Sequence, residues 1–127
     1  MVRTAFEKDK GLILVHVRLI GKESIVIKMA LDTGARFTII PHEVAEKIGC
    51  IPEKEAKRVQ IMTGSGCEEV LAVVIPHFAT LGKKLENFEV LVHDLPEGSF
   101  VDGVLGLDFL KRFTLKIDFQ KAYIDLK

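Results

Sequence analysis

The chain has 127 residues and a mass of 14.2 kDa, which is enough for one domain with a single hydrophobic core. Apolar residues make up 48% and charged residues 28%, a composition that excludes disordered, collagen-like and disulfide-scaffold proteins. Eighteen basic residues balance eighteen acidic ones, and no run of Lys or Arg marks a surface for a row of phosphates, so we expect no nucleic-acid partner.

The apolar stretches are much shorter than the roughly 20 residues of a membrane span, and residues 1–8 contain no apolar signal core. We therefore expect no membrane contact and a cytoplasmic location. Cys50 and Cys67 lack the Cys and His spacing of a zinc site, so both are expected to be free thiols. No metal and no cofactor is expected.

The first half of the chain is predicted to hold a β-hairpin, a short strand and a helix. Branched residues dominate 12–20 and 24–31, and the segment between these two strands suits a turn. A short strand over 36–40 precedes a helix over 41–48, because Pro41 suits a first helical turn and Gly49 ends the segment.

The second half is predicted to be mainly β, with one more helix. Two strands flank the glycine-rich turn 63–66, which predicts a hairpin with a mobile tip. Leu107, Leu110 and Phe113 recur at helical spacing and predict a short helix over 107–113. The strands predicted in this half are 58–62, 67–75, 78–81, 87–92, 114–119 and 122–126.

The segment Asp32-Thr33-Gly34 carries the most chemical information in the sequence. It places a carboxylate at the end of an apolar strand, where the Thr33 hydroxyl can join a hydrogen-bond network and Gly34 lets the backbone turn tightly. A carboxylate held in this way is suited to acid–base catalysis. The tripeptide alone fits equally well a turn in which Asp32 caps a bend, since turns favour Asp and Gly.

The order of the motifs extends this interpretation. Asp32-Thr33-Gly34-Ala35 follows an apolar strand, a glycine-rich hairpin comes next, and Val104-Leu105-Gly106 precedes the second predicted helix. In this order the chain resembles the retropepsins, the retroviral-type aspartic proteases, over residues 11–126. The resemblance implies a mostly β, single-lobe acid-protease β-barrel with two short helices and a flap hairpin, in one domain over residues 1–127.

The resemblance also implies residue roles. The catalytic group is Asp32, with Thr33 and Gly34 in its supporting loop, and residues 62–67 form a flap that closes over an extended peptide. Substrate contacts are assigned to Ala35, Arg36, Met62, Thr63, Gly64, Ser65, Gly66, Val104 and Leu105. At least one of the last two residues is expected to belong to the core instead.

Aspartic proteolysis requires two carboxylates that share one proton, so that one stays protonated while the other activates water. The chain has one Asp-Thr-Gly and is too short for two homologous lobes. We therefore expect a homodimer whose two-fold axis places Asp32 opposite its own copy, an endopeptidase acting on peptides or unfolded proteins. The alternative is a non-catalytic peptide-binding or dimerisation module of the same fold, and a third possibility is a barrel in which the tripeptide is only a turn.

Three departures separate the chain from the retroviral pattern. Arg36 and Asp108 stand where the viral enzymes carry charges of the opposite sign, which predicts either an ion pair between them or two independent surface charges. The smallest viral enzymes have strand and loop where this chain has the predicted helix over 41–48. In this feature the chain resembles the cellular and prokaryotic members of the clan, including the retroviral-protease-like domains of ubiquitin-shuttle proteins. Residues 114–126 are expected to pair within the chain rather than with a partner.

Overall fold

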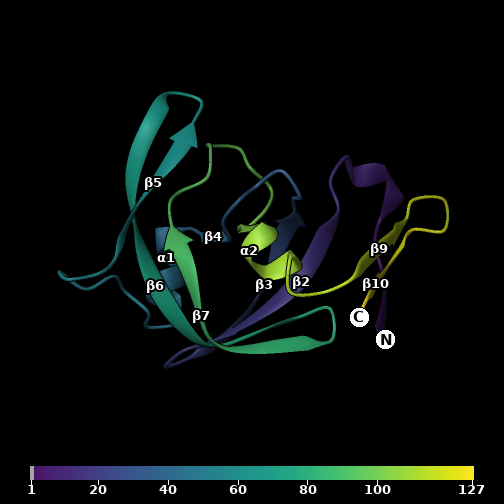
Figure 1. The fold of residues 1–127 in the computed structure, drawn as a ribbon, viewed down its shortest axis with the longest axis horizontal. Coiled ribbons are helices and arrows are strands. Elements are labelled where there is room, and N and C mark those ends of the chain that lie inside the picture. Colours follow the sequence, from purple (N-terminus) through teal and green to yellow (C-terminus); the bar gives the residue numbers. More distant parts are fainter. Residues whose placement is uncertain (1) are drawn as a thin grey trace.

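The computed structural model describes residues 2–127, which form mainly β-strands with two short α-helices (Figure 1). The elements in chain order are β1 (Val2–Ala5), the 3-10 helix η1 (Lys8–Lys10), β2 (Leu14–Ile20), β3 (Ser24–Leu31), β4 (Ile39–Ile40), α1 (His42–Lys47), β5 (Arg58–Thr63), β6 (Gly66–Thr80), β7 (Lys83–Val92), β8 (Val104–Leu105), α2 (Leu107–Leu110), β9 (Leu115–Asp118) and β10 (Tyr123–Leu126). Within residues 2–127, neither helix has the length and apolar character needed to cross a bilayer.

Seven strands form a sheet in the order β2-β3-β8-β4-β7-β6-β5, and β2 also pairs with β6, so the sheet closes on itself. Most neighbours are antiparallel, whereas β3 with β8 and β4 with β7 are parallel. The long strand β6 makes the closure possible, since its first part pairs with β5 and its last part with both β7 and β2. The predicted β-barrel with two short helices is therefore confirmed.

The prediction of two separate strands over 67–75 and 78–81 is wrong, because β6 runs through both segments without a break. Pro76 lies within β6 although proline cannot donate a ladder hydrogen bond. In the structure, the register between β6 and β7 skips Pro76 and Asn87, and Asn87 has the left-handed φ of 51°. The irregularity lets the strand absorb the proline and continue into its pairing with β2.

A second sheet of three strands, in the order β1-β10-β9, brings the two ends of the chain together (Figure 1). The β9–β10 pairing confirms the expected hairpin within the chain, while β1 was not predicted. The Arg3 guanidinium donates two hydrogen bonds, of 2.8 and 2.9 Å, to the carboxylate of the buried Asp125. The hydrogen bond from Arg3 holds the pKa of Asp125 below its ordinary value.

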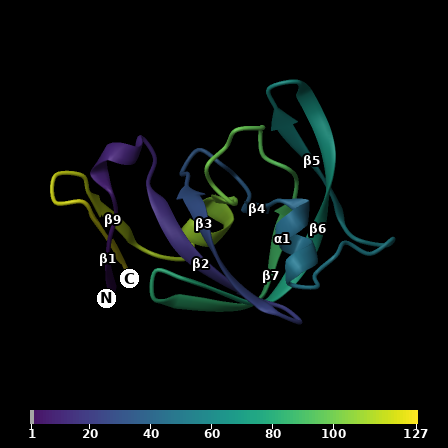
Figure 2. The same cartoon turned by 180° about the vertical axis from the view of Figure 1, so that it is seen from behind.

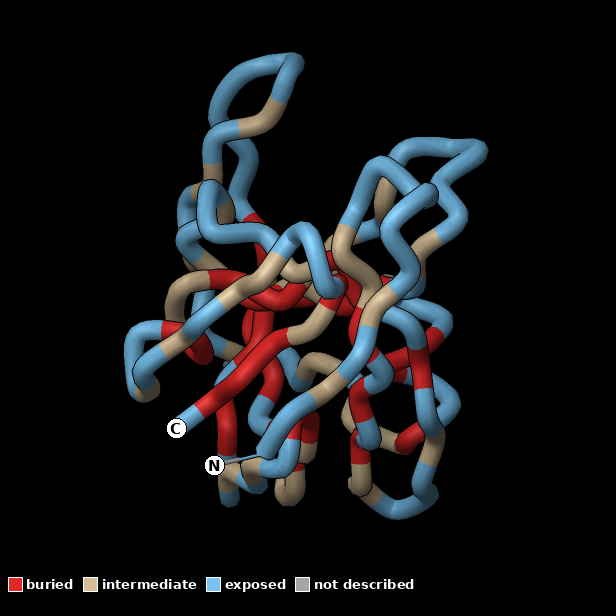
Figure 3. The backbone as a smooth tube through the Cα atoms, turned by 90° about the vertical axis from the view of Figure 1, so that its right-hand side faces the viewer, coloured by how far each residue is buried: buried red, intermediate tan, exposed pale blue. Residues whose placement is uncertain are grey.

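The core lies inside the barrel and includes Phe109 and Leu110 of α2, and buried backbone runs through the middle of the molecule (Figure 3). Phe109 of α2 packs against Phe78 and Phe88, with ring centroids 5.6 and 6.1 Å away. Helix α2 is shorter than the predicted 107–113, because Arg112 and Phe113 donate to carbonyls only three residues back. Phe113 still reaches the core and contacts Phe109 at 5.1 Å.

Helix α1 lies on the outside of the sheet, as the view from behind shows (Figure 2). It covers His42–Lys47, close to the predicted range of 41–48, and buries Val44 and Ala45. Gly49 follows it with φ of 71°, the left-handed conformation that ends a helix. The predicted helix is confirmed.

Candidate active site

Asp32 lies directly after β3, at the point where the strand leaves the barrel. Its backbone N–H donates to the Leu105 carbonyl at 3.0 Å, so β8 holds the loop on one side. The Gly34 N–H donates to Oδ1 of the Asp32 carboxylate at 2.8 Å, and the Ala35 N–H donates to the Asp32 carbonyl at 3.2 Å. These bonds orient an exposed carboxylate on a fixed turn.

The loop after Asp32 is held along its whole length by the segment around α2. Leu107 N–H donates to the Ala35 carbonyl at 2.8 Å, and Asp108 N–H donates to the Arg36 carbonyl at 3.2 Å. A Cβ atom at Gly106 would lie 2.6 Å from the Phe37 carbonyl oxygen, so only glycine permits this close approach of two backbones. The Val104-Leu105-Gly106 motif therefore supports the Asp32 loop by direct packing.

Thr38 and Asp108 form the polar centre of this support. Thr38 is fully buried, and its hydroxyl donates to Asp108 Oδ1 at 2.6 Å while accepting from the Gly106 N–H at 3.1 Å. Oδ2 of Asp108 accepts from the Thr38 N–H at 2.9 Å. The predicted ion pair between Arg36 and Asp108 is wrong, because Thr38 occupies the carboxylate. Sequence reasoning missed Thr38, although a polar residue two positions before the buried Ile40, on the same face, requires a buried partner.

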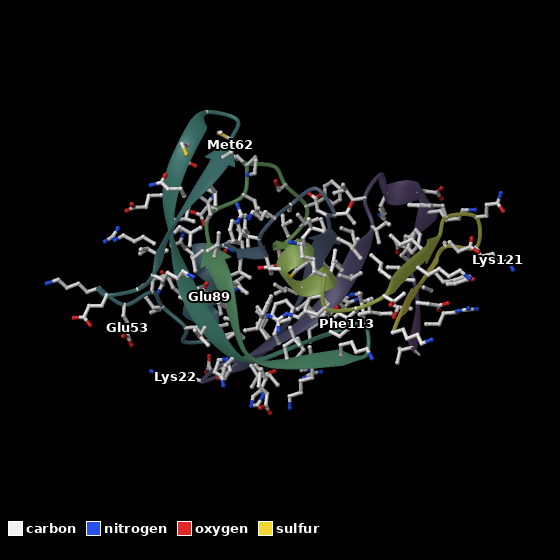
Figure 4. The ribbon with its side chains drawn as sticks, in the orientation of Figure 1. Lys22, Glu53, Met62, Glu89, Phe113 and Lys121 are labelled. Carbon is white, nitrogen blue, oxygen red and sulfur yellow. The ribbon has the colours of Figure 1, made fainter. Side chains whose placement is uncertain are left out.

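Strands β5 and β6 form a hairpin that projects from the barrel, at the upper left in Figure 1. Thr63 pairs with Gly66 across the turn, and the Thr63 hydroxyl donates to the Gly66 carbonyl at 3.0 Å. Gly66 has φ of 117°, which explains the need for glycine there. Met62, near the tip, is 82% exposed (Figure 4).

A cavity of about 450 Å³ lies between the Asp32 loop and this hairpin. It contains four of the residues that sequence analysis assigned to the site, namely Gly34, Ala35, Arg36 and Met62. The other lining residues are Phe37, Ile39, Gln60, Ile61 and Cys67. Of these, Cys67 belongs to the predicted flap 62–67, and the other four were not predicted. The lining does not include Thr63, Gly64, Ser65 and Gly66, which form the hairpin tip. We name this cavity the hairpin subsite.

Val104 and Leu105 differ in their surroundings. Leu105 is fully buried and belongs to the core, whereas Val104 is half-buried and pairs with Ala30 and Ile39. Thr33 is exposed beside Asp32. Asp32 and Thr33 are thus both exposed, and within residues 2–127 the Thr33 hydroxyl makes no hydrogen bond.

The loop 93–103 borders the same end of the barrel and is tied to its neighbours by charged side chains. His93 Nε2 contacts Glu68 Oε2 of β6 at 2.9 Å, and Asp102 Oδ2 accepts from the Lys28 N–H at 3.1 Å. Asp94 Oδ1 accepts from the backbone N–H of His42 at 3.0 Å and contacts its Nδ1 at 3.1 Å; the pKa of Asp94 is lowered, mainly by the backbone bond. A larger cavity of about 680 Å³ lies between this loop and α1, and no residue of the Asp32-Thr33-Gly34 turn lines it.

A closed β-barrel with an Asp-Thr-Gly loop held between β3 and β8 defines a retropepsin-like domain. The solved structure of a retropepsin-like aspartic protease from Rickettsia conorii has the same fold, with a TM-score of 0.71 over 98% of this chain and 88% of that one, at 23% identity. The aspartyl protease family matches residues 15–109. The chain therefore belongs to the aspartyl protease family, as the resemblance in sequence predicted.

Two curated relatives are similar over most of this chain. DNA damage-inducible protein 1 of Phaeosphaeria nodorum is 29% identical over 117 residues, which cover 91% of this chain and 26% of that protein. The UBA domain-containing protein Mud1 of Schizosaccharomyces pombe is 30% identical over 109 residues, covering 86% of this chain and 31% of that protein. The chain thus spans between about a quarter and a third of these relatives.

Proposed function

We propose that this protein is a homodimeric aspartic endopeptidase that hydrolyses extended peptide segments. The observation that carries the proposal is the Asp32 loop, in which an exposed carboxylate is held by the backbone of 34–35 and by the buried Thr38–Asp108 pair. A turn with no further role does not require this amount of buried polar support. One carboxylate is not enough for the reaction, so the second comes from the Asp32 of another copy.

In the proposed dimer the two Asp32 carboxylates share one proton. The ionised carboxylate takes a proton from a water molecule, and the water oxygen attacks the scissile carbonyl carbon. The protonated carboxyl group gives its proton to the carbonyl oxygen, which produces a tetrahedral diol. The C–N bond then breaks as the amine nitrogen takes a proton from one carboxyl group, while a diol hydroxyl returns its proton to the other carboxylate, so that the product acid is released and the pair again holds one shared proton. No covalent intermediate forms on the enzyme.

We assign the β5–β6 hairpin the role of a flap that covers the peptide. An extended peptide adds main-chain hydrogen bonds to an open strand edge, and β5 is the last strand of the seven-stranded sheet. The exposed Thr33 beside Asp32 is assigned to the hydrogen-bonded scaffold of the pair. The free thiols Cys50 and Cys67 are compatible with a reducing compartment, in line with the expected cytoplasmic location.

The test compares the wild type with Asp32→Asn, which keeps an oxygen for the Gly34 N–H while removing the charge. Both proteins are incubated with a pool of random peptides from pH 3 to 8, and cleavage is measured by mass spectrometry together with the mass of the particle in solution. Asp9→Asn, which changes an exposed aspartate in η1, is the control.

The proposal predicts cleavage by the wild type and by Asp9→Asn, and none by a folded Asp32→Asn dimer. A dimer that binds peptides without cutting them would instead identify a non-catalytic module of the same fold. A wild type that stays a monomer under the assay conditions would refute the mechanism.

A further inference from the structure

Arg36 stands out in the hairpin subsite because its charge is not neutralised. Among residues 2–127, its guanidinium has no hydrogen bond to any side chain or carbonyl and no carboxylate within salt-bridge distance. Two other cations of the same region are paired: Arg58 with Glu69 at 2.9 Å and Lys57 with Glu89 at 3.3 Å. Arg36 is thus available to a ligand, while these neighbours are already satisfied.

The backbone of Arg36 is rigid although its side chain is exposed. Its carbonyl accepts from the Asp108 N–H, and the residues on either side are held through Ala35 and Thr38. The guanidinium carbon lies 5.2 Å from the centroid of the Phe37 ring, a distance at which a cation is attracted by the aromatic face. Both features reduce the conformational entropy that the Arg36 side chain loses when it binds a ligand.

The rest of the hairpin subsite contains no charge that would compete with Arg36. The described lining consists of glycine, apolar residues, Cys67 and the amide of Gln60, so Arg36 is its single charged member. A guanidinium offers two parallel N–H donors that match a carboxylate, and a partly covered site strengthens this pairing. The subsite also adjoins the Asp32 loop, since Gly34 and Ala35 belong to its wall.

We infer that Arg36 selects peptides that place a carboxylate in the hairpin subsite. The inference rests on the proposed function and names its substrate class: segments with an acidic side chain near the cleaved bond, or with a free C-terminal carboxylate at that distance. A two-fold dimer contains the subsite twice, once on each side of the Asp32 pair. Acidic residues are therefore favoured at matching positions before and after the scissile bond.

The experiment uses peptide pairs that differ only by Glu or Gln at one position, each with a free or an amidated C-terminus. We expect the wild type to cleave the best Glu peptide about fivefold faster than its Gln partner, measured as kcat/KM. The ratio should fall towards one in high salt, which screens an exposed ion pair. Amidation of the C-terminus shows whether Arg36 binds the acidic side chain or the terminal carboxylate. It abolishes faster cleavage only if the terminal carboxylate is the bound group.

Three variants identify the group responsible. Arg36→Gln should bring the Glu to Gln ratio to about one, and Arg36→Glu should favour Lys at the same position. Arg58→Gln loses the same charge on β5 but lies outside the subsite lining, so it should keep the wild-type ratio. Equal cleavage of all Glu and Gln pairs by the wild type would overturn the inference and leave the proposed protease intact.

Binding provides a readout that does not depend on catalysis. Fluorescence anisotropy of labelled Glu and Gln peptides with Asp32→Asn, and with Asp32→Asn/Arg36→Gln, measures the same preference without turnover. If the wild type cuts nothing, a Glu preference that disappears in the double variant still supports the role of Arg36. Equal affinities in Asp32→Asn would refute that role.

Discussion

The substitution Thr38→Val removes the buried hydroxyl that connects the Asp32 loop to α2 while keeping nearly the same shape. Two bonds are lost: the donation to the Asp108 carboxylate at 2.6 Å, and the acceptance from the buried Gly106 N–H at 3.1 Å. A hydrogen bond to a charged group contributes about 1.5–3 kcal/mol, and an unsatisfied buried N–H costs about 1–3 kcal/mol. Because the two losses belong to one network and do not add fully, we expect a destabilisation of about 3 kcal/mol.

The control is Thr38→Ser, which keeps both bonds and removes one buried methyl group, at a cost of about 1 kcal/mol. Urea unfolding measures both variants at a fixed protomer concentration, since the proposed dimer would make stability depend on concentration. The expected difference of about 2 kcal/mol corresponds to about a 30-fold change in the folding constant. If Thr38→Val were no less stable than Thr38→Ser, the hydroxyl would not support the loop and the reasoning would be refuted.

Three further predictions concern other contacts. The hydrogen bond from Arg3 lowers the pKa of Asp125 in the folded protein. The stability that this pair contributes should therefore be complete above the pKa of an unfolded Asp, about 3.9, and be lost as the pH falls below it. Melting temperatures measured from pH 2 to 6 should accordingly differ between the wild type and Arg3→Gln near pH 6 and converge in acid. Gly106→Ala should cost about 2 kcal/mol in urea unfolding, because its Cβ meets the Phe37 carbonyl, whereas Gly64→Ala has open space and should change stability by a few tenths at most. His93 Nε2 contacts the Glu68 carboxylate of β6 at 2.9 Å and connects the β5–β6 hairpin to the loop 93–103, so His93→Ala should speed hydrogen exchange in β5 at a fixed pH, and unchanged exchange rates would contradict this role of the contact.

Local patterns predicted the parts of the fold that depend on local chemistry. The alternation of buried and exposed residues in β2 and the branched residues of β3 are visible in sequence, and so are the limits of α1 set by Pro41 and Gly49. The Asp32 turn was predictable because its Gly34 N–H bonds to a carboxylate only two residues away. All these signals lie within a few positions of the chain.

The contacts that failed to be predicted join segments far apart in the chain. Thr38 and Asp108 are 70 positions apart in the chain. The opposite charges of Arg36 and Asp108 had instead suggested an ion pair between those two residues. Strand β1 was missed because Val2–Ala5 has no distinctive pattern and is stabilised by pairing with β10 and by the bond from Arg3 to Asp125. The hairpin subsite combines the Asp32 loop with β5 and β6, so its lining was only partly foreseeable.

One chain forms the whole Asp32 loop of the proposed site, but it supplies only one of the two carboxylates that the reaction needs. Backbone bonds to Ala35 and Arg36 and the Thr38–Asp108 pair all lie within one chain, so the loop has its shape before any partner arrives. The terminal sheet is likewise paired within the chain through β1, β10 and β9. In the proposed mechanism, the part that residues 2–127 of one chain leave open is the second carboxylate, which would come from the Asp32 of another copy. Assembly of the proposed dimer would therefore supply the chemistry of the protease rather than its fold.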